Sequence, residues 1–155
     1  PYIKGIMGGE NARLLYTLCD NIEGHDEPKV LTYLAPRADC PECYEKTRWE
    51  RLPDGARFYV NTLSTAVELA GVSFMDQLPV TVAWISAVLP DGKTELDTLV
   101  AGMVRMEDYT RLKKGDELRP VFRQGPKASA SDVMWVLKGT KEFPRGYVAS
   151  KYYKV

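Results

Sequence analysis

The three cysteines and the single histidine are the side chains of this sequence best suited to bind a metal ion. Cys40 and Cys43 enclose the tetrapeptide Cys-Pro-Glu-Cys. Two cysteines at this spacing can direct both thiolates from one tight turn toward a tetrahedral ion, and the proline presets part of that turn. The tetrapeptide therefore predicts one half of a zinc site.

A structural zinc ion takes four protein ligands, so two more must come from elsewhere in the chain. Cys19 precedes the tetrapeptide, and His25 follows Cys19 in the same loop-like segment. This spacing allows two loops to close on one ion. We predict that Cys19, His25, Cys40 and Cys43 bind a structural Zn²⁺. An oxygen of Asp20, Glu23 or Asp26 is the alternative to the histidine nitrogen.

The sequence leaves other uses of these cysteines open. They can be small buried residues of a metal-free fold. A redox pair at this spacing usually opens a helix in an α/β protein, a context that is missing here. A catalytic zinc needs a general base beside an open coordination position, and no residue nearby suits that role. With an odd number of cysteines and the one histidine in the cluster, we predict neither a disulfide framework nor a catalytic residue.

Short strands and loops must position these residues in the first part of the chain, residues 1–53. Residues 13–18 read as a strand or as the end of a helix, whereas residues 29–34 and 46–52 have strand composition. The segments between them are rich in Asn, Gly, Asp and Pro, which is typical of turns. This pattern predicts a rubredoxin-like zinc ribbon.

Residues 54–140 carry five clearer strand signals, rich in Val, Ile, Thr and aromatic residues. A helical turn at 107–114 separates the third signal from the fourth. Gly102 predicts a bulge in the third strand, and Pro120 predicts an edge or bulged position in the fourth. This order predicts a mostly β protein whose ribbon precedes a five-stranded OB-fold barrel, although a fragment of a β-sandwich has similar spacing. The expected strands cover residues 57–65, 79–89, 98–105, 117–123 and 133–138.

The last segment, residues 141–155, is basic and aromatic. Such a segment is either an additional strand of the barrel or a C-terminal arm that wraps a partner. Because five strands are already accounted for, we expect the arm.

The 21 basic and 21 acidic residues cancel, so bulk charge favours neither nucleic acid nor a membrane surface as a partner. No apolar run approaches the length of a membrane span. The residues after Pro1 lack the layout of a secretory signal, so we expect a cytoplasmic location. A local basic cluster can attract the phosphates of CoA or of nucleic acid, unless it is a solvated face. Its members are Arg111, Lys113, Lys114, Arg119, Arg123 and Lys127.

The order of these motifs resembles the zinc-ribbon and OB-fold proteins that accompany thiolase-like and other acyl-CoA enzymes in bacteria and archaea. The sequence departs from that family at Ile22, where a second cysteine usually stands. Either His25 replaces that ligand or the ion is lost. The segments that carry the resemblance are Leu18-Cys19-Asp20, Pro36-Arg37, Cys40–Cys43, Phe58–Thr65, Leu78-Pro79 and Leu112–Leu118.

The resemblance implies an accessory subunit that pairs with a thiolase-fold catalytic subunit and has no activity alone. It implies acyl-CoA as a ligand at the subunit boundary. The small subunit of (E)-2-benzoylsuccinyl-CoA thiolase, from anaerobic toluene degradation, is one candidate. Aromatic residues of the ribbon are expected either to dock on the partner or to fill the ribbon's own core. They are Tyr16, Tyr33, Tyr44 and Trp49.

Two alternative functions require different structural features. An OB-fold nucleic-acid-binding module requires exposed aromatics on its second and third strands beside a basic groove. A tautomerase that uses the amine of Pro1 as a general base requires a β-α-β repeat, and the sequence shows no pair of helices to form one.

Overall fold

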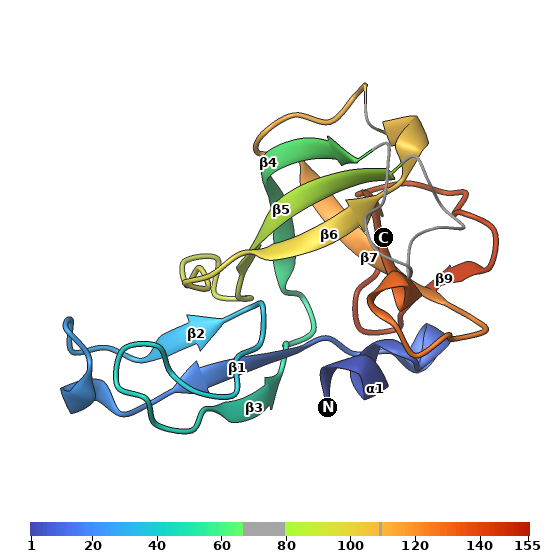
Figure 1. The fold of residues 1–155 in the computed structure, drawn as a ribbon. Helices are drawn as coiled ribbons and strands as arrows, with labels where there is room; N and C mark the ends of the chain where they lie inside the picture. The colour runs from blue at the N-terminus through green and yellow to red at the C-terminus, as the bar shows by residue number, and fades with distance from the viewer. Residues whose placement is uncertain (67–79, 109) are drawn as a thin grey trace.

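The computed structural model describes residues 1–66, 80–108 and 110–155, and it shows a mostly β protein with two sheets (Figure 1). A three-stranded sheet that carries the cysteines precedes a closed five-stranded barrel, so the predicted fold class is confirmed. Leu78 and Pro79, expected at the start of the second barrel strand, and Tyr109 of the expected helical turn lie outside the described residues.

The first sheet is antiparallel and has the strand order β2-β1-β3. Its strands are β1 (Leu15–Cys19), β2 (Leu31–Tyr33) and β3 (Arg48–Arg51). Residues 15–18 are therefore in a strand and do not end a helix. A short helix, α1 (Tyr2–Ile6), and a 3-10 turn (Gly9–Asn11) precede this sheet. None of the helices in the described residues has the length and apolar character needed to cross a membrane.

The barrel has the strand order β4-β5-β6-β8-β7, and a pairing between β4 and β7 closes it. All pairings are antiparallel except β6 with β8, where Val104 pairs with Trp135. A 3-10 turn (Met106–Asp108) follows β6 in the region of the expected helical turn. The strands are β4 (Arg57–Ala66), β5 (Val80–Val88), β6 (Val100–Val104), β7 (Glu117–Arg123) and β8 (Val133–Leu137).

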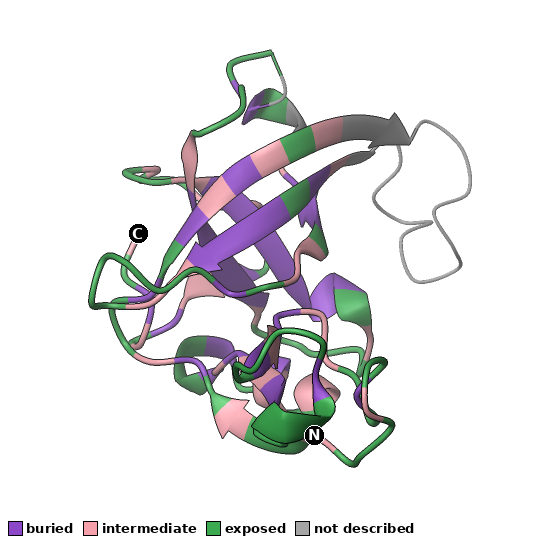
Figure 2. Ribbon diagram, turned by 90° about the vertical axis from the view of Figure 1, so that its left-hand side faces the viewer, coloured by how far each residue is buried: buried purple, intermediate pink, exposed green. Residues whose placement is uncertain are grey.

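The barrel interior is filled by large apolar side chains, and Figure 2 shows buried residues gathered along its strands. Phe58 and Trp135 meet edge to face, with ring centroids 4.9 Å apart. Gly102 pairs regularly with Ala83, so the predicted bulge is absent at this position. Glycine is required at position 102 because the Trp135 side chain packs directly against it. A Cβ atom there would lie 2.4 Å from Nε1 of Trp135.

Pro120 does not lie in an edge strand, contrary to the expectation from sequence. On one side it pairs with Trp135 of β8. On the other side it falls between the stretch of β7 that pairs with β4 and the stretch that begins at Val121 and pairs with the last strand. A residue without an N–H is tolerated there because the ladder is interrupted at that point.

The C-terminal segment contributes an additional strand to the sheet, so the expectation of an arm that wraps a partner instead of adding a strand is wrong. Residues Tyr147–Ala149 form β9, which pairs antiparallel with β7. Tyr153 is 2% exposed and packs against Phe58 in the main apolar cluster. Its hydroxyl donates to the carbonyl of Leu52 (3.0 Å) and accepts from the amide of Leu14 (3.1 Å). This tail therefore joins the ribbon to the barrel.

A second connection runs from β2 to the loop between β5 and β6. The carboxylate of Asp97 accepts hydrogen bonds from the amide (2.8 Å) and hydroxyl (2.9 Å) of Thr32 and lies 3.2 Å from Nζ of Lys29. The amide of Leu34 donates to the hydroxyl of Thr98 (2.8 Å). Side chains of the barrel loop thus cap the free edge of the first sheet.

The Tyr153→Phe substitution should lower the free energy of unfolding by about 1–3 kcal/mol, because it leaves a buried N–H and a buried C=O short of one partner each. Urea unfolding followed by circular dichroism measures this loss. Tyr152→Phe is the matched control, since the Tyr152 hydroxyl has no protein partner among the described residues. Equal stability of Tyr153→Phe and the wild type would show that this bridge is energetically unimportant.

The Asp97→Asn variant should lose stability at neutral pH but not in acid. Burial alone raises the pKa of Asp97, but the hydrogen bonds from Thr32 and Lys29 outweigh burial and hold that pKa below its usual range. The stabilisation is therefore present above the unfolded-state pKa of about 4 and is lost as the pH falls through the lower folded-state pKa. Unfolding of wild type and variant at pH 7 and pH 3 tests this, with Glu95→Gln as the control from the same loop.

Candidate metal centre

Two loops at the end of the first sheet bring the four predicted ligands together. Cys19 is the last residue of β1, and His25 follows a 3-10 turn (Ile22–Gly24) directly after it. Cys40 and Cys43 lie in the turn between β2 and β3. One ligand atom from each of these four residues lies within 4.8 Å of all the others. The convergence expected from the sequence is therefore present.

The spacing of the donor atoms fits a tetrahedral zinc ion. Zn–S bonds of about 2.3 Å place two sulfurs on a tetrahedron about 3.8 Å apart. The Sγ atoms of Cys19 and Cys43 are 3.5 Å apart, and Sγ of Cys40 is 3.5 Å from Nε2 of His25. Three thiolates and one imidazole form a soft donor set of the kind that selects zinc over magnesium or calcium. All four positions of the ion are then filled by protein atoms, which is typical of a structural site.

Hydrogen bonds within the tetrapeptide turn fix its two cysteines. The amide of Cys40 donates to the carbonyl of Glu45 (2.8 Å), and the amide of Tyr44 donates back to the carbonyl of Cys40 (2.9 Å). Tyr44 has a φ of 63°, a left-handed conformation that costs a residue with a Cβ about 1–2 kcal/mol. The turn is thus tight enough to force an aromatic residue into a glycine-like conformation.

The orientation of the imidazole of His25 is set by its second nitrogen. Nδ1 lies 2.7 Å from the carbonyl oxygen of Lys29, so Nδ1 carries the proton and donates it. Nε2 is then left with its lone pair directed at the cysteine sulfurs. The hydrogen bond to the Lys29 carbonyl raises the pKa of His25. Backbone carbonyls commonly orient metal-binding histidines in this way.

The two buried cysteines have opposite shifts in pKa. Burial raises the pKa of Cys19 to about 11, helped by the neighbouring cysteine sulfurs. Burial acts on Cys40 in the same direction, but hydrogen bonds from the Tyr33 hydroxyl and the amides of Cys43 and Glu42 lower its pKa to about 6. These hydrogen bonds favour the thiolate form of Cys40, which is the form that binds a metal.

Two residues that support the site were not identified from the sequence. Tyr33 is 4% exposed, and its hydroxyl donates to Sγ of Cys40 across 3.3 Å. Gly24 lets the loop of His25 lie against the tetrapeptide, because a Cβ there would come within 2.8 Å of Cβ of Cys43. The position of Gly24 directly before the candidate ligand His25 was a signal available in the sequence. The role of Tyr33 depends on strand register, which the local sequence does not reveal.

The oxygen ligands considered as alternatives do not join the cluster. Within the described residues, the group of converging donors that contains the cysteines has His25 as its only other member. The carboxylate of Asp20 instead pairs with Nε of Arg48 at 3.0 Å. Asp26 meets the tetrapeptide only through its amide, which donates to Glu42 (3.0 Å). His25 is therefore the fourth donor that the geometry favours.

The other sets of residues singled out in the sequence are divided by the fold. Within the basic cluster, Arg111 pairs with Asp108, Arg119 with Glu117 and Arg123 with Asp132, so these arginines do not form one uncompensated patch. Of the four ribbon aromatics, Tyr33 is in the core and Tyr16 packs partly against it. Tyr44 is 81% exposed and Trp49 is 38% exposed.

No protein-family model and no curated protein matches the chain. One solved structure to which it is similar is described as "Ltp2-ChsH2(DUF35) aldolase". The TM-score is 0.46 and the sequence identity 16%, over 80% of this chain and 82% of that chain.

The purified protein should bind zinc in equimolar amount, and His25→Ala should weaken the binding. Loss of a ligand should cost more than the roughly 10–100-fold that outer-shell substitutions cost. Competition with a chromophoric chelator measures the affinity. His25→Cys should restore most of it, and Glu23→Ala and Asp26→Ala are controls that should not change it. Undiminished affinity in His25→Ala would remove the histidine from the ligand set.

Proposed function

We propose that this chain is a non-catalytic, cytoplasmic accessory subunit of a thiolase-type acyl-CoA enzyme complex, and that a structural zinc ion holds its docking surface in place. The observation that carries the proposal is the closed donor set of Cys19, His25, Cys40 and Cys43. An ion held by four protein atoms has no position for a substrate, so its contribution is to rigidity. The motif order of the sequence supports the choice of enzyme partner.

The docking surface is proposed to centre on Tyr44, beside the metal ligands. This aromatic ring is 81% exposed although its backbone is in the left-handed conformation. Conformational strain at an exposed residue suggests a role outside the folding of the chain itself. A hollow lined by residues 35–41, among them the charged Arg37 and Asp39, adjoins the ring. Tyrosine beside such a hollow is typical of the anchor residues of protein interfaces.

The catalytic thiolase-fold subunit of the complex is proposed to supply the reactive cysteine and histidine groups. In this chain the only histidine and all three cysteines belong to the metal cluster. The substrate of the complex is proposed to be an acyl-CoA thioester bound near the subunit boundary. (E)-2-benzoylsuccinyl-CoA is the candidate that follows from the sequence resemblance.

The alternative, a nucleic-acid-binding barrel, is supported by one residue. Trp84 on β5, the second barrel strand, is 45% exposed, as that function requires. Its cross-strand neighbours are Thr62 and Ala101, which carry no charge. These two neighbours supply none of the basic side chains that single-strand binding requires, so the accessory-subunit role is better supported.

Affinity capture from the source organism tests the proposal. The tagged, zinc-loaded chain should retain a thiolase-fold acyl-CoA enzyme, identified by mass spectrometry, and the pair should cleave an acyl-CoA that neither component cleaves alone. Tyr44→Gly should weaken this association about tenfold, as loss of an interface anchor does. This variant suits the test because glycine accepts the left-handed backbone without strain.

Trp84→Ser, on the barrel, is the matched control, since it removes an exposed aromatic at a distance along the chain from the metal loops. Capture that is unaffected by Tyr44→Gly but abolished by Trp84→Ser would move the docking surface to the barrel. Thioester cleavage by the isolated chain, or the absence of any thiolase-fold partner, would contradict the accessory role.

A further inference from the structure

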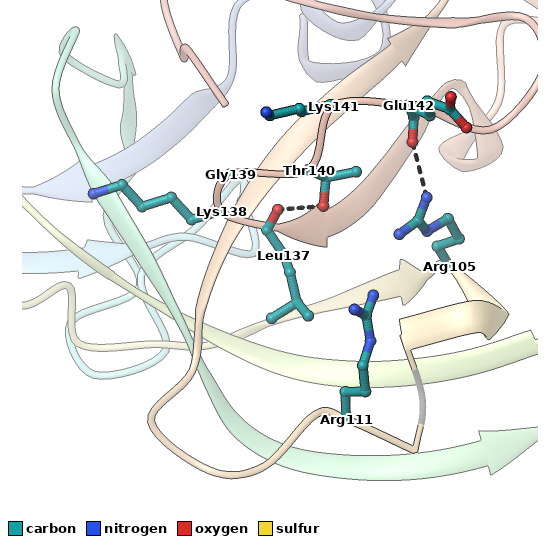
Figure 3. Close-up of a pocket in the computed structure, with 8 residues that line it drawn as sticks. All are labelled: Arg105, Arg111, Leu137, Lys138, Gly139, Thr140, Lys141 and Glu142. Atoms are coloured by element: carbon teal, nitrogen blue, oxygen red, sulfur yellow. Dashed lines mark hydrogen bonds between the residues drawn. The ribbon is translucent and has the colours of Figure 1, made fainter.

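A polar pocket on the barrel has no role in the metal site or in the docking surface proposed above. It lies where the segments after β6 and β8 meet, and its volume is about 390 Å³. Figure 3 shows two arginine guanidinium groups, from Arg105 and Arg111, directed toward the loop that follows β8. That loop supplies the rest of the lining, residues 137–142.

A fully buried carboxylate holds the two arginines in place. Asp108 accepts hydrogen bonds from Nε (3.2 Å) and Nη2 (2.8 Å) of Arg105, and it also pairs with Arg111. The remaining nitrogen of Arg105 donates to the carbonyl of Glu142 (2.8 Å). Arg105 thereby donates from all three of its nitrogens, whereas Arg111 uses only Nη2 and its side chain is 61% exposed. Arg111 keeps free donors at a fixed position.

The loop adds main-chain donors on the opposite wall. The amide and hydroxyl of Thr140 both donate hydrogen bonds to the carbonyl of Leu137, at 3.1 and 2.6 Å. Gly139 has a φ of 88°, which allows this tight turn. Within the described residues, the amides of Gly139, Lys141 and Glu142 have no protein acceptor. Exposed N–H groups in such a turn form an anion-binding concavity.

Four of the five charged residues that line the pocket are cationic. Asp108 offsets one of the two guanidinium charges, and Glu117 lies 3.4 Å from the ammonium group of Lys138. Glu107 is 3.8 Å from Arg105 and largely exposed. Lys141 has no acidic partner among the described residues. Glu142 is the one carboxylate in the lining, and Figure 3 shows its side chain on the far side of Arg105 from Arg111.

We propose that this pocket binds the phosphate group of a small phosphorylated molecule. A tetrahedral oxyanion presents acceptors in several directions at once, which suits the free donors of Arg111, Lys141 and the loop amides that line one pocket. The volume exceeds that of a phosphate ion and leaves room for part of the molecule that carries it. The phosphate belongs either to the nucleotide end of CoA or to another metabolite. The site stands on its own contacts and does not depend on the proposed function.

Titration of the zinc-loaded, isotope-labelled full chain at constant ionic strength tests the site. Inorganic phosphate should shift the amide resonances of Gly139, Lys141 and Glu142, and acetate at equal concentration should not. Arg111→Gln and Lys141→Gln should each weaken phosphate binding about tenfold, as expected for loss of a charge-assisted hydrogen bond. Lys93→Gln, an exposed lysine of another turn, is the matched control. Glu142→Gln should strengthen binding, because it removes the opposing charge.

Adenosine 3′,5′-bisphosphate separates the two sources of phosphate. Binding several-fold tighter than inorganic phosphate identifies the nucleotide end of CoA, whereas equal affinity identifies a site that reads phosphate alone. Shifts scattered over other basic surfaces, or unchanged affinity in both Arg111→Gln and Lys141→Gln, would overturn the proposal. Neither result bears on whether a thiolase-fold partner is captured, so the two proposals fail separately.

Discussion

The first sheet depends on its metal ligands because it has almost no apolar interior of its own. The small cluster at its centre consists of Cys19, Leu31, Tyr33 and Cys40, with Cys43 packed against it. Three of these five residues are candidate ligands, so the donors and the core of the ribbon are largely the same atoms. A core this small cannot offset the conformational entropy lost on folding. The proposed ion would add its binding free energy to the folding free energy of this region.

The opposite end of the ribbon is held by the barrel. Ile6, Leu14 and Leu52 are fully or nearly fully buried and belong to the same apolar cluster as Phe58 and Trp135. The ribbon is therefore anchored at one end by a shared core and at the other by the ligand cluster. In Figure 1 the loops that carry the ligands extend away from the barrel strands. Such an arrangement leaves the tetrapeptide turn accessible to another molecule.

Local chemistry made the convergence of the cysteines with His25 and the barrel strands predictable. A cysteine pair in a turn and an apolar run between turns can each be recognised within a few residues of sequence. The errors came from contacts between residues far apart in sequence. Tyr153 reaches Leu14 and Leu52, and β9 adds to β7 at a place where Pro120 interrupts the ladder. Gly102 is a glycine because of Trp135, not because of its own strand. Strand pairing decides such contacts, and the sequence alone does not specify it.

The left-handed conformation of Tyr44 links the metal cluster to the exposed surface. Its amide donates to the carbonyl of one ligand residue, Cys40, and it directly follows another, Cys43. The backbone strain of Tyr44 is therefore offset by the contacts that hold Cys40 and Cys43 together. With the thiolates bound to one ion, the ring is fixed in its exposed position. Without the ion, the turn is free to relax toward an unstrained conformation and the ring loses that position. With the proposed ion bound, metal loading and the presentation of this aromatic residue would be one equilibrium.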